Sequence, residues 1–237
     1  MAAPTPVCFV AGATGFVGRE VVARLAPRAR VIAHVRPGSA KLATWRERFA
    51  ALGAEVDTTA WEPAALAATL RACAPTHVFC LIGTTRGAAR GEGVQGDPYL
   101  AIDYGLTQLL CDAAAAAGST PRLVYLSSVG VGPKARSAYL AARWKAEEAV
   151  RGAGLPWVIA RPSFIVGAGD GARRDDGRAG EKAAAVVADG VLAVVGLIAK
   201  RTRARYRSIT PEALADVLVR AGLDGAADRI IEGIHLR

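Results

Sequence analysis

Three glycines, spaced three residues apart, follow a short apolar run near the start of the chain. The run is Val7–Ala11, and the glycines are Gly12, Gly15 and Gly18. Apolar residues then recur at helical spacing over Phe16–Leu25, so the glycines fall in a turn between a buried strand and a helix. In such a turn the first glycine permits the bend, the second lets backbone amides approach a phosphate, and the third permits close helix packing. The turn predicts a site for the phosphates of a nucleotide, which meet the positive end of the helix dipole.

The alternative is a tight turn that binds nothing, in a chain that contains 26 glycines. A second apolar strand over residues 30–35 favours the nucleotide site, because it follows the helix at the distance that a strand–helix–strand unit requires. Strand-like and helix-like segments then alternate. We expect strands at residues 55–59, 77–82, 122–127 and 157–161, and helices at residues 41–52, 62–74, 98–117 and 138–152. This alternation predicts an α/β fold with a doubly wound parallel sheet of the Rossmann type, which binds ligands at the carboxyl ends of its strands.

The length of 237 residues, of which 52% are hydrophobic, favours a single domain. We expect one NAD(P)-binding domain, with its dinucleotide-binding core at residues 1–165 and a small substrate-side region at residues 166–237. Residues 167–181 are rich in glycine, arginine and aspartate, which indicates an exposed loop that could close on a substrate. Thr210 and Pro211 are expected to open a last amphipathic helix.

Composition excludes several other classes of protein. The four cysteines lack the spacing of a disulfide framework or a metal site, and the three histidines are far apart, so we expect no metal and a reducing compartment. The chain does not open on a secretory segment, and the apolar stretch at residues 183–199 is too short and interrupted to span a membrane. We expect a cytoplasmic protein, and a homodimer is the assembly that we consider for it.

The net charge of +9 comes mainly from scattered arginines. One basic cluster stands out, at residues 200–207. We interpret it as a solvated edge that attracts phosphate, and only secondarily as a surface for nucleic acid or membrane. A nucleic-acid partner is therefore not expected.

The end of the second strand indicates which cofactor binds. An acidic side chain there would hydrogen-bond the ribose 2′-hydroxyl of NAD, but none is present. Arg36 instead offers a guanidinium to a 2′-phosphate, with Ser39 and Lys41 close by in the sequence. A surface arginine on a turn is the alternative. The sequence predicts NADP(H).

A serine pair and a tyrosine follow two of the later strands. Ser127 and Ser128 end the strand at residues 122–127, and Tyr139 lies in the next helix with Arg143 one turn further on. A tyrosine phenol ordinarily has a pKa of about 10. A cation one turn away stabilises a phenolate and so assists proton exchange at neutral pH. The alternative is an ordinary amphipathic helix preceded by loop serines.

Several motifs now resemble those of one enzyme family. The run Gly-Ala-Thr-Gly-Phe-Val-Gly at residues 12–18 is similar to the glycine motif of the extended and atypical short-chain dehydrogenase/reductases. Residues 139–147 and 155–163 resemble the atypical reductases that carry an NAD(P)H-binding domain. Residues 83–87 and the pair Asp103-Tyr104 are most similar to the Tat-interacting-protein oxidoreductase group. The resemblance covers nearly the whole chain.

The family pattern of Ser and Tyr-x-x-x-Lys implies roles for individual residues here. Tyr139 would donate or remove the proton, Ser128 (or Ser127) would hold the substrate oxygen, and Arg143 would bind the nicotinamide ribose and tune the tyrosine. Gly83 offers backbone without a side chain beside the cofactor, and Pro162 opens the substrate side. The predicted catalytic residues are Ser128, Tyr139 and Arg143. The predicted cofactor-binding residues are Gly12, Thr14, Gly15, Phe16, Val17, Gly18, Arg36, Gly83, Thr84, Thr85, Ser127, Tyr139, Arg143 and Pro162.

Two departures from the family pattern leave two functions open. Arg143 stands where the family has lysine, and it hardly ever releases its proton, while Lys145 points away from the face that bears Tyr139. The aspartate that commonly follows the third strand is missing, and Trp61 nearby either covers the adenine or belongs to the core. The family includes working reductases and NADP(H)-binding regulators without known chemistry. We therefore expect an NADPH-dependent reductase of a small carbonyl compound, with a non-catalytic redox sensor or scaffold as the alternative.

Overall fold

The computed structural model describes residues 4–163 except 86–88, 90–92 and 94, and then residues 165–166 and 208–236. The predicted loop at residues 167–181, the apolar stretch at residues 183–199 and the basic cluster at residues 200–207 lie outside the described residues.

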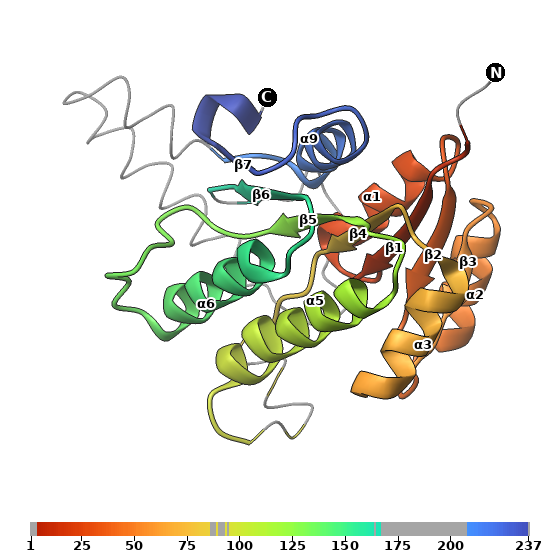
Figure 1. Cartoon of the computed structure of the whole chain (residues 1–237), viewed down its shortest axis with the longest axis horizontal. Coiled ribbons are helices and arrows are strands. Elements are labelled where there is room, and N and C mark those ends of the chain that lie inside the picture. The colour runs from red at the N-terminus through yellow and green to blue at the C-terminus, as the bar shows by residue number, and fades with distance from the viewer. Residues whose placement is uncertain are drawn as a thin grey trace.

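A seven-stranded sheet forms the centre of the protein, in the order β3-β2-β1-β4-β5-β6-β7, and every neighbouring pair is parallel (Figure 1). The strands are β1 (Val7–Ala11), β2 (Arg30–His34), β3 (Glu55–Asp57), β4 (His77–Cys80), β5 (Arg122–Leu126), β6 (Trp157–Arg161) and β7 (Arg229–Glu232). The strand order reverses between β1 and β4, which is the switch point where open α/β sheets bind ligands. The predicted doubly wound, Rossmann-like fold is confirmed.

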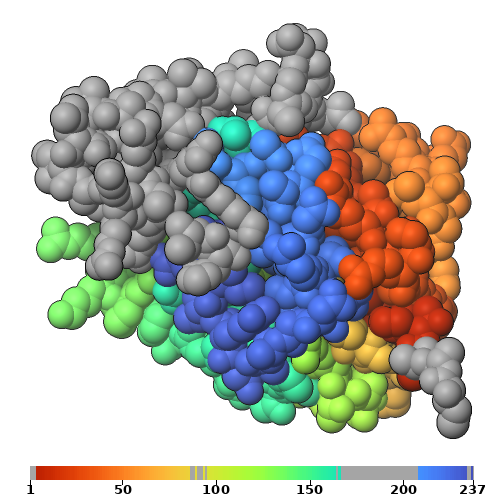
Figure 2. Space-filling model, turned by 90° about the horizontal axis from the view of Figure 1, so that it is seen from above, coloured from red at the N-terminus to blue at the C-terminus, as the bar shows by residue number. Residues whose placement is uncertain are grey.

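Helices cover both faces of the sheet (Figure 1). The α-helices are α1 (Phe16–Leu25), α2 (Leu42–Ala50), α3 (Pro63–Cys73), α5 (Thr107–Ala116), α6 (Ala138–Gly152) and α9 (Pro211–Leu223), with a π-helix η1 (Tyr99–Leu106) and a 3₁₀-helix η2 (Gly233–Leu236). Helices α1, α2 and α9 pack on one face, and α3, α5 and α6 on the other. Figure 2 shows the C-terminal segment that contains α9, in blue, lying against the N-terminal segment that contains α1.

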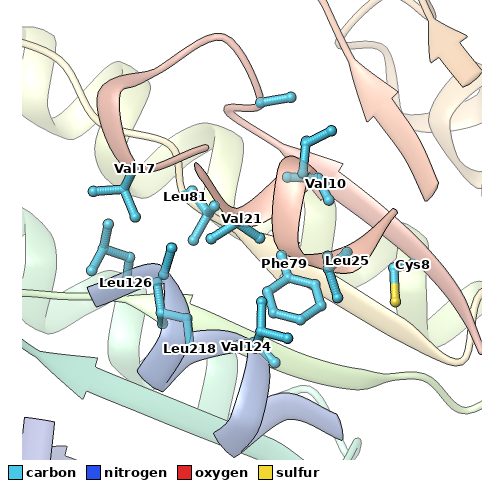
Figure 3. Packing of buried hydrophobic residues seen from close by; sticks show 14 of the residues in the cluster. Cys8, Val10, Val17, Val21, Leu25, Phe79, Leu81, Val124, Leu126 and Leu218 are labelled. Atoms are coloured by element: carbon cyan, nitrogen blue, oxygen red, sulfur yellow. The ribbon is translucent and has the colours of Figure 1, made fainter. Parts of the chain in front are cut away.

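The apolar run that opens the chain forms the middle of the core. Residues 8–11 of β1 are fully buried, as a central parallel strand requires. Figure 3 shows the α1 side chains Val21 and Leu25 packed with Phe79 of β4 and Leu218 of α9. Full burial of an apolar side chain of this size contributes about 1.5–3 kcal/mol. This packing fixes α1, and with it the glycine turn, against the centre of the sheet.

The strand predicted at residues 77–82 ends at Cys80, and the helix predicted at residues 41–52 spans Leu42–Ala50. Other features also differ from the sequence-based predictions. The helix predicted at residues 98–117 begins as the π-helix η1, a form that is rare and often found at functional sites. The third strand ends at Asp57, because the Asp57 carboxylate accepts hydrogen bonds from the backbone N–H and hydroxyl of Thr59 and turns the chain. The edge strand β7 was not predicted at all.

The start of the last helix is as predicted, since Thr210 caps α9 by accepting a hydrogen bond from the Ala213 amide. Within the described part of the chain, no helix combines the length and the apolar character needed to cross a bilayer.

Candidate functional site

The glycine turn between β1 and α1 has two glycines that the fold requires and one that it does not. Gly12 has a φ of +81°, and a Cβ there would lie 2.6 Å from the Leu81 carbonyl oxygen. A Cβ at Gly18 would overlap the Gly12 carbonyl. Gly15 is exposed and extended (φ −68°, ψ 170°), and the nearest atom to its Cβ would be the Gly12 oxygen at 3.1 Å. Close packing therefore explains Gly12 and Gly18, whereas Gly15 keeps open a surface at the helix N-terminus.

This surface carries the donors that an anion needs. The first hydrogen bond inside α1 runs from the Arg19 N–H to the Gly15 carbonyl. First-turn amides of α-helices in general lack an acceptor within the helix, and the helix dipole adds positive potential at this end. Thr14 and Phe16 are half-buried beside this surface, while the Val17 side chain belongs to the core.

Parallel pairing brings the other predicted residues to the same edge of the sheet. Ala11 pairs with Cys80, Cys80 with Tyr125, and Leu126 with Ala160. The segments that follow these strands therefore emerge side by side at the carboxyl ends. They contain Gly12, Gly83, Thr84, Thr85, Ser127, Ser128 and Pro162.

Arg36 lies at this edge beyond β2. It is exposed, and its carbonyl accepts a hydrogen bond from the Ser39 amide in the turn that leads to α2. His34, at the end of β2, is buried and its Nε2 donates to the Thr59 carbonyl at 2.9 Å. The half-buried Trp61 ring meets the His34 ring edge-on and packs against the core. Trp61 thus contributes to the core beside the strand ends.

Arg143 of α6 is buried, and its guanidinium makes three contacts. Nη1 donates to the Tyr125 hydroxyl at 3.0 Å and to the Leu126 carbonyl at 2.7 Å. Nη2 lies 2.9 Å from Oδ1 of Asp103, close but poorly aligned for a hydrogen bond. The guanidinium carbon is also 5.4 Å from the centre of the Tyr139 ring. These surroundings suit an arginine, because its planar guanidinium can donate to several acceptors at once.

Asp103 reaches this cluster from the π-helix η1. It is fully buried, and its Oδ2 accepts a hydrogen bond from the Thr84 amide at 3.2 Å. Burial raises the pKa of Asp103 to about 6, although Arg143 opposes the rise. Burial alone would lower the pKa of Arg143. The nearby Tyr125, Tyr139 and Asp103 outweigh this effect, so the pKa of Arg143 is raised above its usual value.

Gly83 lies directly over the Asp103–Arg143 pair. A Cβ at Gly83 would stand 2.5 Å from Nη2 of Arg143 and 3.7 Å from Oδ1 of Asp103. The missing side chain thus makes room for the ion pair, in addition to any role beside a cofactor. The pair joins the segment after β4, the end of β5 and helix α6.

The two serines after β5 have different surroundings. The Ser127 hydroxyl is buried and donates to Oε1 of Glu147 at 2.6 Å. Ser128 is half-buried, and among the described residues its hydroxyl makes one long contact, of 3.4 Å, with the Val129 carbonyl. Pro162 is buried, and its carbonyl accepts from the Val129 amide at 2.8 Å. Ser128 is therefore better placed than Ser127 to meet a ligand.

Glu147 forms a second buried charge cluster. Its carboxylate accepts two hydrogen bonds from Arg161, at 2.8 and 2.6 Å, and one from Arg151 at 3.0 Å, besides that of Ser127. Burial on its own raises the pKa of Glu147, but Arg161 and Ser127 outweigh it and hold the pKa below its usual range. The cluster ties α6 to β6 and to the segment after β5.

Tyr139 is half-buried in the first turn of α6, where the Ser137 side chain caps the helix. The Tyr99 ring of η1 meets the Tyr139 ring edge-on, with 5.4 Å between ring centres. The predicted Tyr139–Arg143 pair is thus in contact, but Arg143 is also held by groups that the sequence reasoning did not assign. These are Asp103 and Tyr125. The sequence signal for a functional Asp103 was its position as the one charged residue within the apolar run of η1.

Comparisons with known proteins agree with this fold. Residues 12–221 match the NAD(P)H-binding family. No curated protein sequence matches the chain. Among solved structures, a candidate epimerase from Burkholderia cenocepacia J2315 is 20% identical with a TM-score of 0.67, over 96% of this chain and 75% of that one.

Two further structures were solved with nicotinamide cofactors. The triphenylmethane reductase of a Citrobacter species, complexed with NADP(H), is 16% identical with a TM-score of 0.60, over 95% of this chain and 68% of that one. The enzyme WbmF of Bordetella bronchiseptica, in complex with NAD+, is 17% identical with a TM-score of 0.62, over 98% of this chain and 76% of that one. At these identities the likeness shows the fold alone. The family match spans most of the chain, and the protein belongs to the NAD(P)H-binding family.

Proposed function

We propose that the protein is an NADPH-dependent oxidoreductase that reduces a small carbonyl compound. The observation that carries the proposal is the position of Tyr139, which lies beside a buried guanidinium in the helix that follows the Ser127–Ser128 segment. Family membership and the open surface at Gly15 support a nicotinamide cofactor at the same edge. The triphenylmethane reductase with NADP(H) shares this fold and supports a reductase.

The cofactor, when bound, supplies the hydride that reduces the carbonyl carbon. Tyr139 then gives its phenolic proton to the carbonyl oxygen, so that the carbonyl becomes an alcohol and the oxidised cofactor remains. Ser128 holds the carbonyl oxygen, because the Ser127 hydroxyl is already bonded to Glu147. Arg143 keeps a positive charge beside the Tyr139 ring, and we assign the cofactor's ribose to the same neighbourhood.

The sequence at residues 83–87 and at Asp103-Tyr104 supports the Tat-interacting-protein oxidoreductase group of the atypical short-chain reductases. A cytoplasmic location, a homodimer and the absence of a nucleic-acid partner stay predictions from the sequence.

One observation favours a second function, that of a non-catalytic NADP(H)-binding sensor or scaffold. The Arg143 guanidinium is engaged by Asp103, Tyr125 and Leu126. Arginine so held can neither relay a proton nor move as a lysine ammonium does. Under this alternative the cofactor would bind, but no carbonyl compound would be reduced.

Cofactor choice provides the first test. Arg36→Ala is expected to weaken NADPH binding about tenfold or more while leaving NADH binding unchanged, because a guanidinium on the 2′-phosphate contributes about 1.5–3 kcal/mol. Fluorescence titration of both cofactors measures the ratio of their dissociation constants. Arg71→Ala, which removes an exposed arginine from α3 on the opposite face, is the control and should change neither constant. An unchanged ratio in Arg36→Ala would remove Arg36 from the site.

A further inference from the structure

We propose that Arg19 is a second residue that selects NADPH, by binding the cofactor's 2′-phosphate together with Arg36. The proposal rests on the proposed function, because it assumes that an NADP-type cofactor lies on the glycine turn. Neither the family match nor the sequence motifs assign a role to Arg19.

The Arg19 guanidinium lies between the phosphate-binding turn and helix α2. Its carbon is 5.9 Å from the centre of the Phe16 ring and 5.8 Å from the centre of the Trp45 ring. Phe16 is the first residue of α1, directly after Gly15, and Trp45 is in the first turn of α2. A dinucleotide whose pyrophosphate occupies the glycine turn extends its adenosine ribose towards the end of β2. The guanidinium therefore lies on the side of the turn that the ribose approaches.

Successive backbone hydrogen bonds shape the turns between Arg36 and the first turn of α2. The Arg36 carbonyl accepts from the Ser39 amide, and the Ser39 carbonyl accepts from the Leu42 amide. The Lys41 carbonyl in turn accepts from the Trp45 amide. These turns connect Arg36 directly to the first turn of α2, which carries Trp45 and the arginine that packs on it. Figure 2 shows the segment that contains α2, in orange, beside that of α1.

Among the described residues, no carboxylate forms an ion pair with Arg19, so its positive charge is not compensated there. Two nearby arginines are paired, Arg24 of α1 with Glu20 and Asp216, and Arg30 of β2 with Glu55. Arg48 of α2 also packs on the Trp45 ring, with its guanidinium carbon 5.3 Å from the ring centre. Packing on Trp45 holds the planar group in place while its N–H donors stay available. A guanidinium that is fixed and uncompensated suits a phosphate dianion, which it can bind through two parallel hydrogen bonds.

The test compares cofactor binding in Arg19→Met with that in the natural protein. Methionine keeps a long apolar stem over Phe16 and Trp45 but removes the charge. We expect NADPH to bind about tenfold more weakly and NADH to bind as before, because only NADPH carries the 2′-phosphate. Arg71→Met on α3 loses the same charge on the opposite face and should change neither constant. In the double variant Arg19→Met/Arg36→Met the losses should not add, because both residues would bind one phosphate.

Each other outcome overturns the inference in its own way. Equal weakening of NADPH and NADH in Arg19→Met would place its effect on the shared part of the cofactor, and no weakening would exclude contact altogether. If Arg36→Met lowers the NADPH preference and Arg19→Met does not, the cofactor assignment stands and Arg19 alone is wrong. If the natural protein binds NADPH and NADH equally, the NADPH assignment in the proposed function fails, and the role of Arg19 with it.

Discussion

Replacing Gly15 with valine should abolish NADPH binding in a protein that still folds. Gly15 is exposed, and its φ of −68° and ψ of 170° suit a β-branched residue. The nearest atom to the added Cβ would be a single backbone oxygen at 3.1 Å, and an unsuitable N-cap costs about 1 kcal/mol of stability. The valine methyl groups, however, would cover the amides at the start of α1. We expect at least a roughly hundredfold loss of NADPH affinity, or about 3 kcal/mol.

Fluorescence titration with NADPH, read beside urea unfolding, checks this result. Gly18→Ala is the matched control from the same turn, and its outcome should be the reverse. Its Cβ would overlap the Gly12 carbonyl and crowd Ala13, so this variant should lose stability. A folded Gly15→Val protein with unchanged NADPH affinity would show that the phosphates bind elsewhere.

Removing the Glu147 carboxylate should be the most damaging change to stability. Glu147→Ala would leave Arg161 and Arg151 without their buried partner, and breaking a buried ion pair in this way typically costs about 3–5 kcal/mol. Glu148→Ala, the exposed neighbour in the same helix, should change the free energy of unfolding by less than about 0.5 kcal/mol. Urea unfolding at neutral pH measures both. Equal small losses in the two variants would contradict the cluster's role.

The same cluster predicts a pH dependence. The pKa of Glu147 is held below its usual range in the folded protein. A carboxyl group with a lowered folded pKa contributes stability that is present above its unfolded pKa, about 4.3, and is lost as the pH falls through the folded value. Below about pH 4, the natural protein should therefore lose stability more steeply than Glu147→Ala. Glu148→Ala should follow the natural protein.

The sequence was enough to predict features that depend on neighbours along the chain. The buried run at β1, the glycine turn and the Thr210 cap each depend on residues within one or two turns, and each lies where it was predicted. Strand β7 was missed because it has four residues, of which two are apolar. Its place comes from pairing with β6, many residues earlier in the chain.

The buried charge clusters could not be predicted in the same way. With Arg151 four residues further on, Glu147 has the pattern of a surface ion pair, yet it is buried because Ser127 and Arg161 reach it from other segments. Asp103 and Arg143 meet across forty residues of chain, by way of a π-helix that local pattern does not reveal. The motif therefore identified Tyr139 and Arg143 as a pair but could not show what else holds the arginine.

The measurement that tests the account most directly is NADPH oxidation by the natural protein and by Tyr139→Phe, over a panel of aldehydes, ketones and quinones. We expect turnover by the natural protein, a loss of about 10²–10⁴-fold in Tyr139→Phe because the proton donor is gone, and unchanged NADPH affinity. Tyr104→Phe, which removes the hydroxyl of a half-buried tyrosine in η1, should keep the rate. Full activity in Tyr139→Phe would contradict the site, and tight NADPH binding without turnover of any compound would contradict the enzyme and favour the sensor or scaffold.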